Sequence, residues 1–286
     1  MIERIYIPTV RRADNQITFN NLPKAFQERV VMVVEPDERH LYNYPCEYLE
    51  IPEEMVGAWN QLAQTRLLIH KHAGAIKYCM VDDDIKIKRR NSKYWTDISN
   101  MEKSKRDATD EDLLECFDSM SRWLDESDIG VTGFTSSGMF PSDTPYKQTY
   151  GVYSIAFIDG RKLSKIIDKI EIAPEGLRIS EDVLFIFECL ANGLNTRVSN
   201  EWLYYNTSCL TKELDGTRVI WEGMYGDEEQ PDDFDLTDEN YDALKFIQKK
   251  YPHGISFSER NGKRSNTKKW KSVYRPKTES SLESFF

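Results

Sequence analysis

The stretch Ala75-Ile76-Lys77-Tyr78-Cys79-Met80-Val81-Asp82-Asp83-Asp84 is the most informative segment of the chain. Its apolar run has the length of one β-strand, and it ends abruptly where three carboxylates begin. Three adjacent carboxylates repel one another, so they need a compensating charge from a divalent cation, from neighbouring Lys or Arg, or from water. The segment therefore predicts a strand that carries three acidic side chains at its carboxyl end.

A helix is predicted directly before this strand, from about Pro52 to His72. Pro52 and the two glutamates after it suit a first helical turn, where no amide is lost and acids meet the positive end of the dipole. Gly74 is well placed to end the helix. Apolar residues recur with helical spacing and predict one buried stripe, made of Met55, Trp59, Leu62, Ala63 and Leu67.

Apolar runs alternate with helical patterns along most of the chain. The predicted strands cover residues 5–7, 30–34, 48–52, 75–81, 129–134 and 152–158, with an edge strand at 196–198, and the predicted later helices cover residues 110–125, 161–170, 180–192 and 237–251. Ser180 is the expected N-cap of its helix. This alternation predicts an α/β fold with a mostly parallel central sheet, helices on both faces and a C-terminal extension.

The composition is that of a soluble globular protein, with 40% hydrophobic and 30% charged residues among 286. No apolar run approaches the roughly 20 residues of a membrane span, so no membrane association is expected. The first seven residues predict a strand and not a signal peptide. The five cysteines are scattered without a CxxC pair, which indicates reduced thiols in a cytoplasm.

The charges are segregated along the chain. The net charge of −10 argues against nucleic-acid binding. However, residues 227–242 contain nine acids and no Lys or Arg, whereas residues 260–277 contain eight Lys or Arg and no acid. A basic face is therefore compatible with the acidic total.

Residues 64–84 resemble the core of the GT-A glycosyltransferases. In that fold a helix with an Ala-Arg-Asn-like triplet leads through a glycine into a strand that ends in the DXD motif. Thr65-Arg66-Leu67 stands at the triplet, so that only the Arg is kept, and Asp82-Asp83-Asp84 stands at the DXD motif. The similarity extends to the strands that end at Thr9 and Glu35 and to the turn at 180–182, and so spans about residues 2–193. It implies a GT-A-type, Rossmann-like core over residues 1–200 that binds a nucleotide-sugar.

The resemblance implies a UDP-sugar donor, such as UDP-glucose or UDP-arabinose, bound together with Mn²⁺ or Mg²⁺. The residues expected to bind the donor are Thr9, Arg11, Glu35, Arg66, Asp82 and Asp83. Asp84 is the first expected metal ligand, followed by Asp82 and by His253, since many GT-A enzymes supply a late histidine. A structural ion pair for Arg66 and a solvated acidic turn for the aspartates stay open as alternatives.

Glu181 and Asp182 are the expected catalytic acids. In inverting members of this fold, an acid in this region is the general base that takes a proton from the acceptor hydroxyl. Asp182 is slightly favoured over Glu181 for this role. The alternative is that both acids only stabilise the start of a helix, and in a retaining enzyme the role disappears.

Residues 201–275 are expected to form a basic, acceptor-side region. The residues expected to contact DNA are Lys263, Arg264, Lys268, Lys269, Trp270 and Lys271. The alternative is a solvated basic face. Residues 276–286 are expected to be a flexible tail that resembles a sliding-clamp docking peptide, with Leu282, Phe285 and Phe286 as its apolar anchors and Glu279 in place of the usual Gln.

These features together resemble bacteriophage DNA glycosyltransferases that act on 5-hydroxymethylpyrimidines. The resemblance implies transfer of a hexosyl or pentosyl group, with inversion, to 5-hydroxymethylcytosine in double-stranded DNA within the bacterial host cytoplasm during infection. The loop 135–149, with Met139, Phe140 and Tyr146, is a candidate to cover the acceptor. One alternative is a GT-A enzyme that acts on a polysaccharide, lipid-linked or protein acceptor. A second is a non-enzymatic adaptor that binds the clamp.

Overall fold

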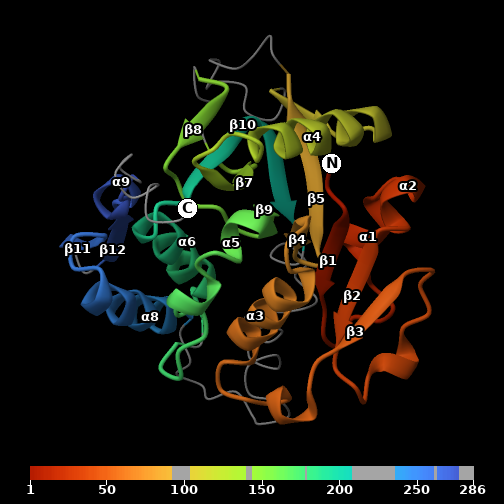
Figure 1. Ribbon diagram of the computed structural model, residues 1–286, viewed down its shortest axis with the longest axis horizontal. Coiled ribbons are helices and arrows are strands. Elements are labelled where there is room, and N and C mark those ends of the chain that lie inside the picture. Colours follow the sequence, from red (N-terminus) through yellow and green to blue (C-terminus); the bar gives the residue numbers. More distant parts are fainter. Residues whose placement is uncertain (92–103, 140–143, 178, 208–235, 261–262, 277–286) are drawn as a thin grey trace, which may run out of the picture.

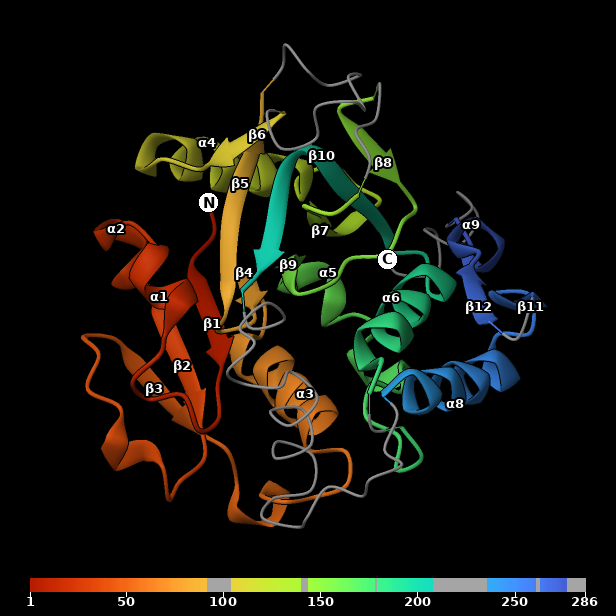
Figure 2. The same ribbon diagram turned by 180° about the vertical axis from the view of Figure 1, so that it is seen from behind.

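A ten-stranded mixed sheet forms the centre of the described part of the chain (Figures 1 and 2). The computed structural model describes residues 1–91, 104–139, 144–177, 179–207, 236–260 and 263–276. In spatial order the strands are β3 (Glu47–Glu50), β2 (Val30–Val34), β1 (Arg4–Pro8), β4 (Lys77–Val81), β9 (Ile155–Asp159), β7 (Ile129–Ser136), β10 (Asn195–Asn206), β5 (Ile85–Arg90) and β6 (Lys105–Asp107), and β8 (Tyr146–Gln148) pairs with β10. All of them except β5, β8 and β9 point in one direction, so the predicted mostly parallel α/β fold is confirmed.

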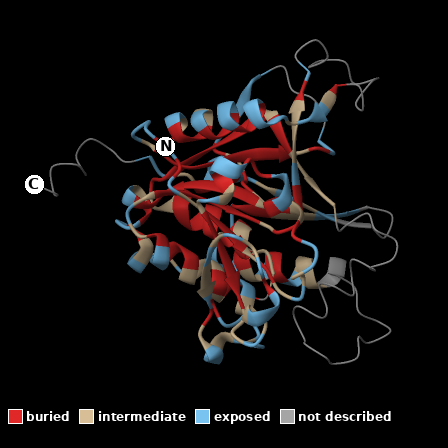
Figure 3. Cartoon of the chain, turned by 90° about the vertical axis from the view of Figure 1, so that its right-hand side faces the viewer, coloured by how far each residue is buried: buried red, intermediate tan, exposed pale blue. Residues whose placement is uncertain are grey.

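Helices cover both faces of this sheet, because successive strand residues point to opposite sides. Tyr6 and Met80 pack on one side with α3 (Gln61–Ala73), α5 (Gly160–Leu163) and α6 (Glu181–Ala191). Ile5 and Cys79 pack on the other side with α1 (Ile17–Asn21), α2 (Lys24–Gln27) and α4 (Asp110–Trp123). Figure 3 shows the resulting buried central layer between helices whose outer faces are exposed.

The C-terminal elements gather beside α6 at one side of the sheet (Figures 1 and 2). They are α8 (Leu236–Lys250), β11 (Ile255–Arg260), β12 (Lys263–Lys268) and α9 (Trp270–Val273). β11 and β12 form an antiparallel hairpin. The expected end of the core at residue 200 falls inside β10. None of the helices in the described ranges has the length and apolarity needed to cross a membrane.

The helix before the aspartates is shorter than predicted. It begins at Gln61 and not at Pro52, and Glu53–Met55 is a separate 3₁₀ turn, η2. Gly57 has φ +70°, a left-handed conformation that cannot continue a right-handed helix. The predicted buried stripe was therefore wrong in part, since Trp59 is 57% and Leu62 42% exposed.

The strand predicted at the sheet edge is an interior strand. β10 lies between β7 and β5 and also pairs with β8. Its polar side chains have partners inside the fold: the hydroxyl of Thr196 donates to the carbonyl oxygen of Tyr150 at 2.6 Å, and Arg197 pairs with Glu126. β8 also turns part of the loop predicted at 135–149 into a strand. Met139 and Tyr146 are exposed, and Phe140 lies outside the described residues.

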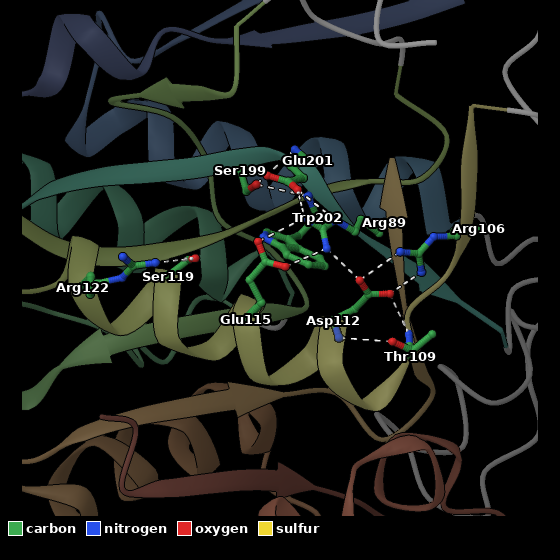
Figure 4. A network of polar contacts seen from close by, with 10 residues as sticks. All are labelled: Arg89, Arg106, Thr109, Asp112, Glu115, Ser119, Arg122, Ser199, Glu201 and Trp202. Atoms are coloured by element: carbon green, nitrogen blue, oxygen red, sulfur yellow. Dashed lines mark hydrogen bonds and ion pairs between the residues drawn. The ribbon is translucent and has the colours of Figure 1, made fainter. Parts of the chain in front are cut away.

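A polar network fixes α4 to the far half of the sheet (Figure 4). Arg89 of β5 contacts Asp112 at 2.7 Å and Glu115 at 2.7 Å on α4, and Glu201 of β10 at 2.6 Å. Its guanidinium also lies 4.5 Å from the ring centre of Trp202. Asp112 closes the capping box of α4, so the helix end and the sheet are held by the same carboxylate.

Candidate active site

The sheet topology brings the predicted donor-binding residues to one edge. β1 pairs in parallel with both β2 and β4, so the carboxyl ends of these strands meet there. Thr9 follows β1, Glu35 follows β2, and Asp82 follows β4. Side chains from segments more than 70 residues apart in sequence are thereby placed within hydrogen-bonding distance.

Asp83 is held by the segment that follows β1. The Thr9 hydroxyl donates to Oδ2 of Asp83 at 2.7 Å, and Nη1 of Arg12 donates to Oδ1 at 2.6 Å. Arg12 also lies 3.4 Å from Asp84. Burial raises the pKa of Asp83 to about 6, although Arg12 opposes the shift. Arg12 was missed by the sequence prediction, which chose its neighbour Arg11; two adjacent arginines after a strand were the available signal.

The backbone of the acidic turn is fixed from two sides. The Thr18 amide donates to the carbonyl oxygen of Asp83 at 2.9 Å, and the Thr18 hydroxyl donates to that of Asp82 at 2.5 Å. The amide of Thr207, just after β10, donates to the carbonyl oxygen of Asp84 at 3.1 Å. The three carboxylates are therefore presented by a rigid turn, as a preorganised site requires.

Arg66 joins the two groups of predicted acids. Its guanidinium lies 3.2 Å from Asp82 and 3.1 Å from Glu181, and its side chain is only 12% exposed. The structure thus brings together the Arg of the helix, the first aspartate after β4 and the acid pair of α6. Nearby Arg therefore compensates the carboxylates, which was one of the options that the sequence left open.

Glu181 and Asp182 differ in their surroundings. Glu181 is 3% exposed, and burial raises its pKa to about 7, against the opposing charge of Arg66. Burial also raises the pKa of Asp182, which is only half-buried. Because Arg66 contacts Glu181 directly, Asp182 is the acid better placed to accept a proton from a ligand.

The acid pair lines a cleft formed by α3, α6, the start of β9 and the loop that precedes β9. Its polar lining comes from Arg66, His70, Asp82, Glu181 and Asp182, and its apolar lining includes Val152, Ile172 and Ile186.

Two serines beside the cleft have left-handed backbone conformations. Ser154 has φ 52° and Ser180 has φ 63°, which are unusual for residues other than glycine. The carbonyl oxygen of Ser154 accepts the amide of Asp82 at 3.0 Å. The prediction that Ser180 caps α6 was wrong for its side chain, which makes no cap bond and contacts Oδ1 of Asn240 at 2.9 Å.

The β11–β12 hairpin reaches this site from the C-terminal region. Lys268 is half-buried, and its positive charge acts to lower the pKa of Asp182. Trp270 is 6% exposed and packs 4.7 Å from Phe187 between ring centres, so the expectation that it contacts DNA is corrected. Lys269 and Lys271 are exposed, and the other predicted DNA contacts, Lys263 and Arg264, belong to β12.

Three predicted site residues lie further out. Glu35 accepts a hydrogen bond from Gln61, and burial raises its pKa. Arg11 is exposed and has φ 54°, and its amide donates to Glu38 at 2.7 Å. His253 is exposed in the turn between α8 and β11, where its carbonyl oxygen accepts the Ser272 hydroxyl. This position does not support His253 as a ligand to a metal at the aspartates.

Asp82 and Asp84 offer hard oxygen ligands but not a complete metal site. Among the described residues, no three His, Cys, Asp or Glu side chains are grouped to hold a metal ion. The negative charge of Asp84 raises the pKa of Asp82, so the two carboxylates lie close enough to interact. Such a pair fits Mg²⁺ or Mn²⁺ that takes its remaining ligands from water and a bound diphosphate, and it does not fit a cation held by protein groups alone.

The fold and the carboxyl ends of β1, β2 and β4 define an α/β protein with an acidic cleft bridged by an arginine. The chain belongs to the TET-associated glycosyltransferase family, whose model matches residues 3–213. This membership confirms the resemblance seen in residues 64–84 and identifies the chain as a member of a glycosyltransferase family. No curated protein matches the chain. A solved structure of UTP-bound UGPase from Acinetobacter baumannii is similar over 88% of this chain and 100% of its own, with 11% identity and a TM-score of 0.38.

Proposed function

We propose that the chain transfers a sugar from a UDP-sugar to the hydroxymethyl oxygen of 5-hydroxymethylcytosine in DNA, with inversion at the anomeric carbon. One observation carries this proposal: Arg66 contacts Asp82 and Glu181 and leaves Asp182 facing the cleft. Membership of the TET-associated glycosyltransferase family supports the reaction class and counts against a non-enzymatic adaptor.

In the proposed reaction, Asp182 takes the proton of the acceptor hydroxyl. The acceptor oxygen then forms a bond to the anomeric carbon, while the bond from that carbon to the diphosphate oxygen breaks and its electron pair leaves with UDP. A raised pKa suits a general base, because the carboxylate gains basicity as burial destabilises its charge. The positive charges of Arg66 and Lys268 oppose this rise in the pKa of Asp182.

The donor is proposed to bind along the ends of β1, β2 and β4. Thr9, Arg12 and Arg66 surround the aspartates there and supply a hydroxyl and two guanidinium groups. Asp82 and Asp84 would hold Mg²⁺ or Mn²⁺ together with the diphosphate. The cation would neutralise charge on the departing UDP. UDP-glucose and UDP-arabinose are the donors to test first.

The acceptor is proposed to enter as a base flipped out of the duplex, since the 5-substituent must reach the cleft. Lys269 and Lys271 are exposed next to the hairpin residue Lys268 and suit contacts to phosphate groups. Met139 and Tyr146 remain candidates to cover the acceptor.

The test is mass spectrometry of hydroxymethylcytosine DNA after incubation with a panel of UDP-sugars and Mn²⁺. We expect a gain of one glycosyl unit on hydroxymethylated DNA and none on unmodified DNA. Asp182→Asn should lower turnover by about 10² to 10⁴-fold, as loss of a general base does. Asp118→Asn is the matched control, because Asp118 lies on α4 with its side chain 68% exposed.

Other outcomes would change the proposal. Sugar-dependent UDP release without any gain on DNA would select a polysaccharide, lipid-linked or protein acceptor. A retained anomeric configuration would remove the role given to Asp182. Failure of UDP plus Mn²⁺ to stabilise the protein would refute the proposal that the chain uses a UDP-sugar donor.

We further propose that the tail binds a replication sliding clamp and so brings the enzyme to new phage DNA in the host cytoplasm. Its anchors, Leu282, Phe285 and Phe286, lie outside the described residues. Deletion of residues 282–286 should abolish binding to a clamp in a pull-down and leave the rate on free DNA unchanged. A loss of folding would show instead that the tail belongs to the core.

A further inference from the structure

One residue that lines the cleft, His70, has a buried ring nitrogen whose role the proposed reaction does not explain. His70 is 4% exposed, and its Nε2 has no hydrogen-bond partner within the described residues. It lies on α3 one turn after Arg66 and lines the same cleft as Glu181 and Asp182. A buried polar atom without a partner costs free energy, so an unpaired nitrogen on a residue that lines a ligand cleft points to a ligand.

The hydrogen bond on the other side of the ring assigns the tautomer. Nδ1 of His70 is hydrogen-bonded to the hydroxyl of Tyr78, a fully buried residue of β4. Burial raises the pKa of Tyr78 well above its ordinary value, so the phenol keeps its proton. That proton meets no acceptor other than Nδ1 among the described residues. The phenol therefore donates to Nδ1, and the imidazole proton lies on Nε2.

The ring stays neutral and fixed. Burial, assisted by the charge of Arg66, lowers the pKa of His70 to about 3, so the imidazole is uncharged at neutral pH. Its ring stacks on Phe185 of α6, with 4.6 Å between centroids and an interplanar angle of 22°. The cleft is thus provided with one neutral donor that is held on both sides.

We infer that His70 recognises the transferred sugar, with Nε2–H donating to a hydroxyl oxygen of the sugar ring. This inference rests on the proposed function. A sugar hydroxyl is both donor and acceptor, so it satisfies Nε2–H and a carboxylate of Glu181 or Asp182 at once. Val152, Ile172 and Ile186 supply the apolar surface that suits the C–H face of the ring.

Other ligand classes fit this part of the cleft less well. A phosphate group would meet the carboxyls of Glu181 and Asp182, which repel an anion when they are ionised. A metal ion needs a nitrogen lone pair, which a protonated Nε2 does not offer. A carbohydrate matches this part of the cleft best, because its hydroxyls pair with a neutral donor and carboxyl acceptors and its C–H face packs on an apolar wall.

The test compares the binding of UDP and of UDP-glucose, each with Mn²⁺, by isothermal titration calorimetry. His70→Phe keeps the ring stacking and removes the donor. We expect it to weaken UDP-glucose about three- to tenfold, the usual loss for one neutral hydrogen bond, and to leave UDP unchanged. His70→Gln places an amide donor near the position of Nε2 and should recover most of the affinity.

His72→Gln is the matched control. His72 lies on the same helix and its Nδ1 also contacts a tyrosine hydroxyl, that of Tyr6 at 2.9 Å, but it is exposed and does not line the cleft. UDP and UDP-glucose should each bind His72→Gln with the same affinity as the wild type. UDP-deoxyglucose donors then identify the hydroxyl, because the donor that lacks the recognised group should no longer distinguish His70→Phe from the wild type.

Two results would overturn the inference. Equal weakening of UDP and UDP-glucose by His70→Phe would show a structural role, and an unchanged affinity for both would show that Nε2 faces only a buried water. If wild-type protein bound neither ligand, the proposed function itself would fail, which is a separate outcome from a failure of His70 alone.

Discussion

Replacement of Arg66 by methionine tests how the acid cluster is stabilised. Met keeps an unbranched side chain of similar length and removes the guanidinium from both of its partners. Glu181 has a side chain only 4% exposed, whereas that of Asp82 is 30% exposed. The two carboxyls should therefore respond differently to the loss of the positive charge.

The expected loss in free energy of unfolding depends on whether Glu181 takes up a proton when the positive charge of Arg66 is removed. In the wild type, burial raises the pKa of Glu181 to about 7, so near pH 7 its ionisation contributes only about 0.4 kcal/mol. Loss of the partly exposed contact to Asp82 adds about 1 kcal/mol. We therefore expect a loss of about 1–2 kcal/mol near pH 7. A buried carboxylate that stayed charged would cost about 3–5 kcal/mol instead.

The same reasoning fixes the pH dependence. Without Arg66, Glu181 remains protonated above pH 7 in the folded state but is ionised in the unfolded chain. The folded variant then binds one proton more, so its free energy of unfolding falls by about 1.4 kcal/mol per pH unit as the pH rises. In the wild type Glu181 is ionised in both states there, and it contributes no slope. The difference between the two proteins should reach about 4 kcal/mol near pH 9.

Urea denaturation at about pH 7, 8 and 9 measures these differences. Arg122→Met is the control, because Arg122 pairs with Asp118 while both side chains are 68% exposed, and it should cost under about 0.5 kcal/mol at each pH. A loss of 3–5 kcal/mol that does not change with pH would refute the reasoning, since it would mean that Glu181 stays charged without its partner.

Two further predictions concern the metal and the C-terminal region. Asp84→Asn should abolish the part of the stabilisation by UDP that requires Mn²⁺, which melting curves with and without Mn²⁺ detect; an undiminished Mn²⁺ effect would remove Asp84 from the metal site. Trp270→Ala should destabilise the fold by about 3–5 kcal/mol, because a buried indole is lost, whereas the exposed neighbour Lys271→Ala should change stability by under about 0.5 kcal/mol. Similar urea midpoints for these two variants would contradict the buried position of Trp270.

Local sequence patterns were sufficient for the elements whose signals are local. The strands β2 and β4 and the helices α4 and α8 lie where apolar runs and helical spacing predicted them. The start of α3 was misplaced because Pro52 and its glutamates suit a helix start, while Gly57 interrupts the helix only through its left-handed conformation. β10 was misjudged because its buried polar side chains are satisfied by partners that are distant in sequence.

Contacts within one short segment followed from the sequence, whereas contacts between distant segments were missed. The aspartates and Arg66 lie within one helix, glycine and strand unit, and the structure joins them as that unit implies. The contacts of Arg12 with Asp83, and of His70 with the cleft, depend on how separate elements pack. Neither follows from spacing in the sequence, because each requires the relative positions of two elements.

The C-terminal region is outside the family match, yet it supports the helix that carries the acid pair. Asn240 of α8 contacts Ser180 at the start of α6, and Trp270 packs on Phe187 in its middle. The amide of Arg275 donates to the carbonyl oxygen of Leu190 at 3.0 Å, near its end. Contacts at three levels restrict both the position and the tilt of α6, and so the direction in which Asp182 faces. The proposed reacting groups therefore lie within residues 3–213, which the family model matches, while contacts from Asn240, Trp270 and Arg275 hold the helix that carries Asp182.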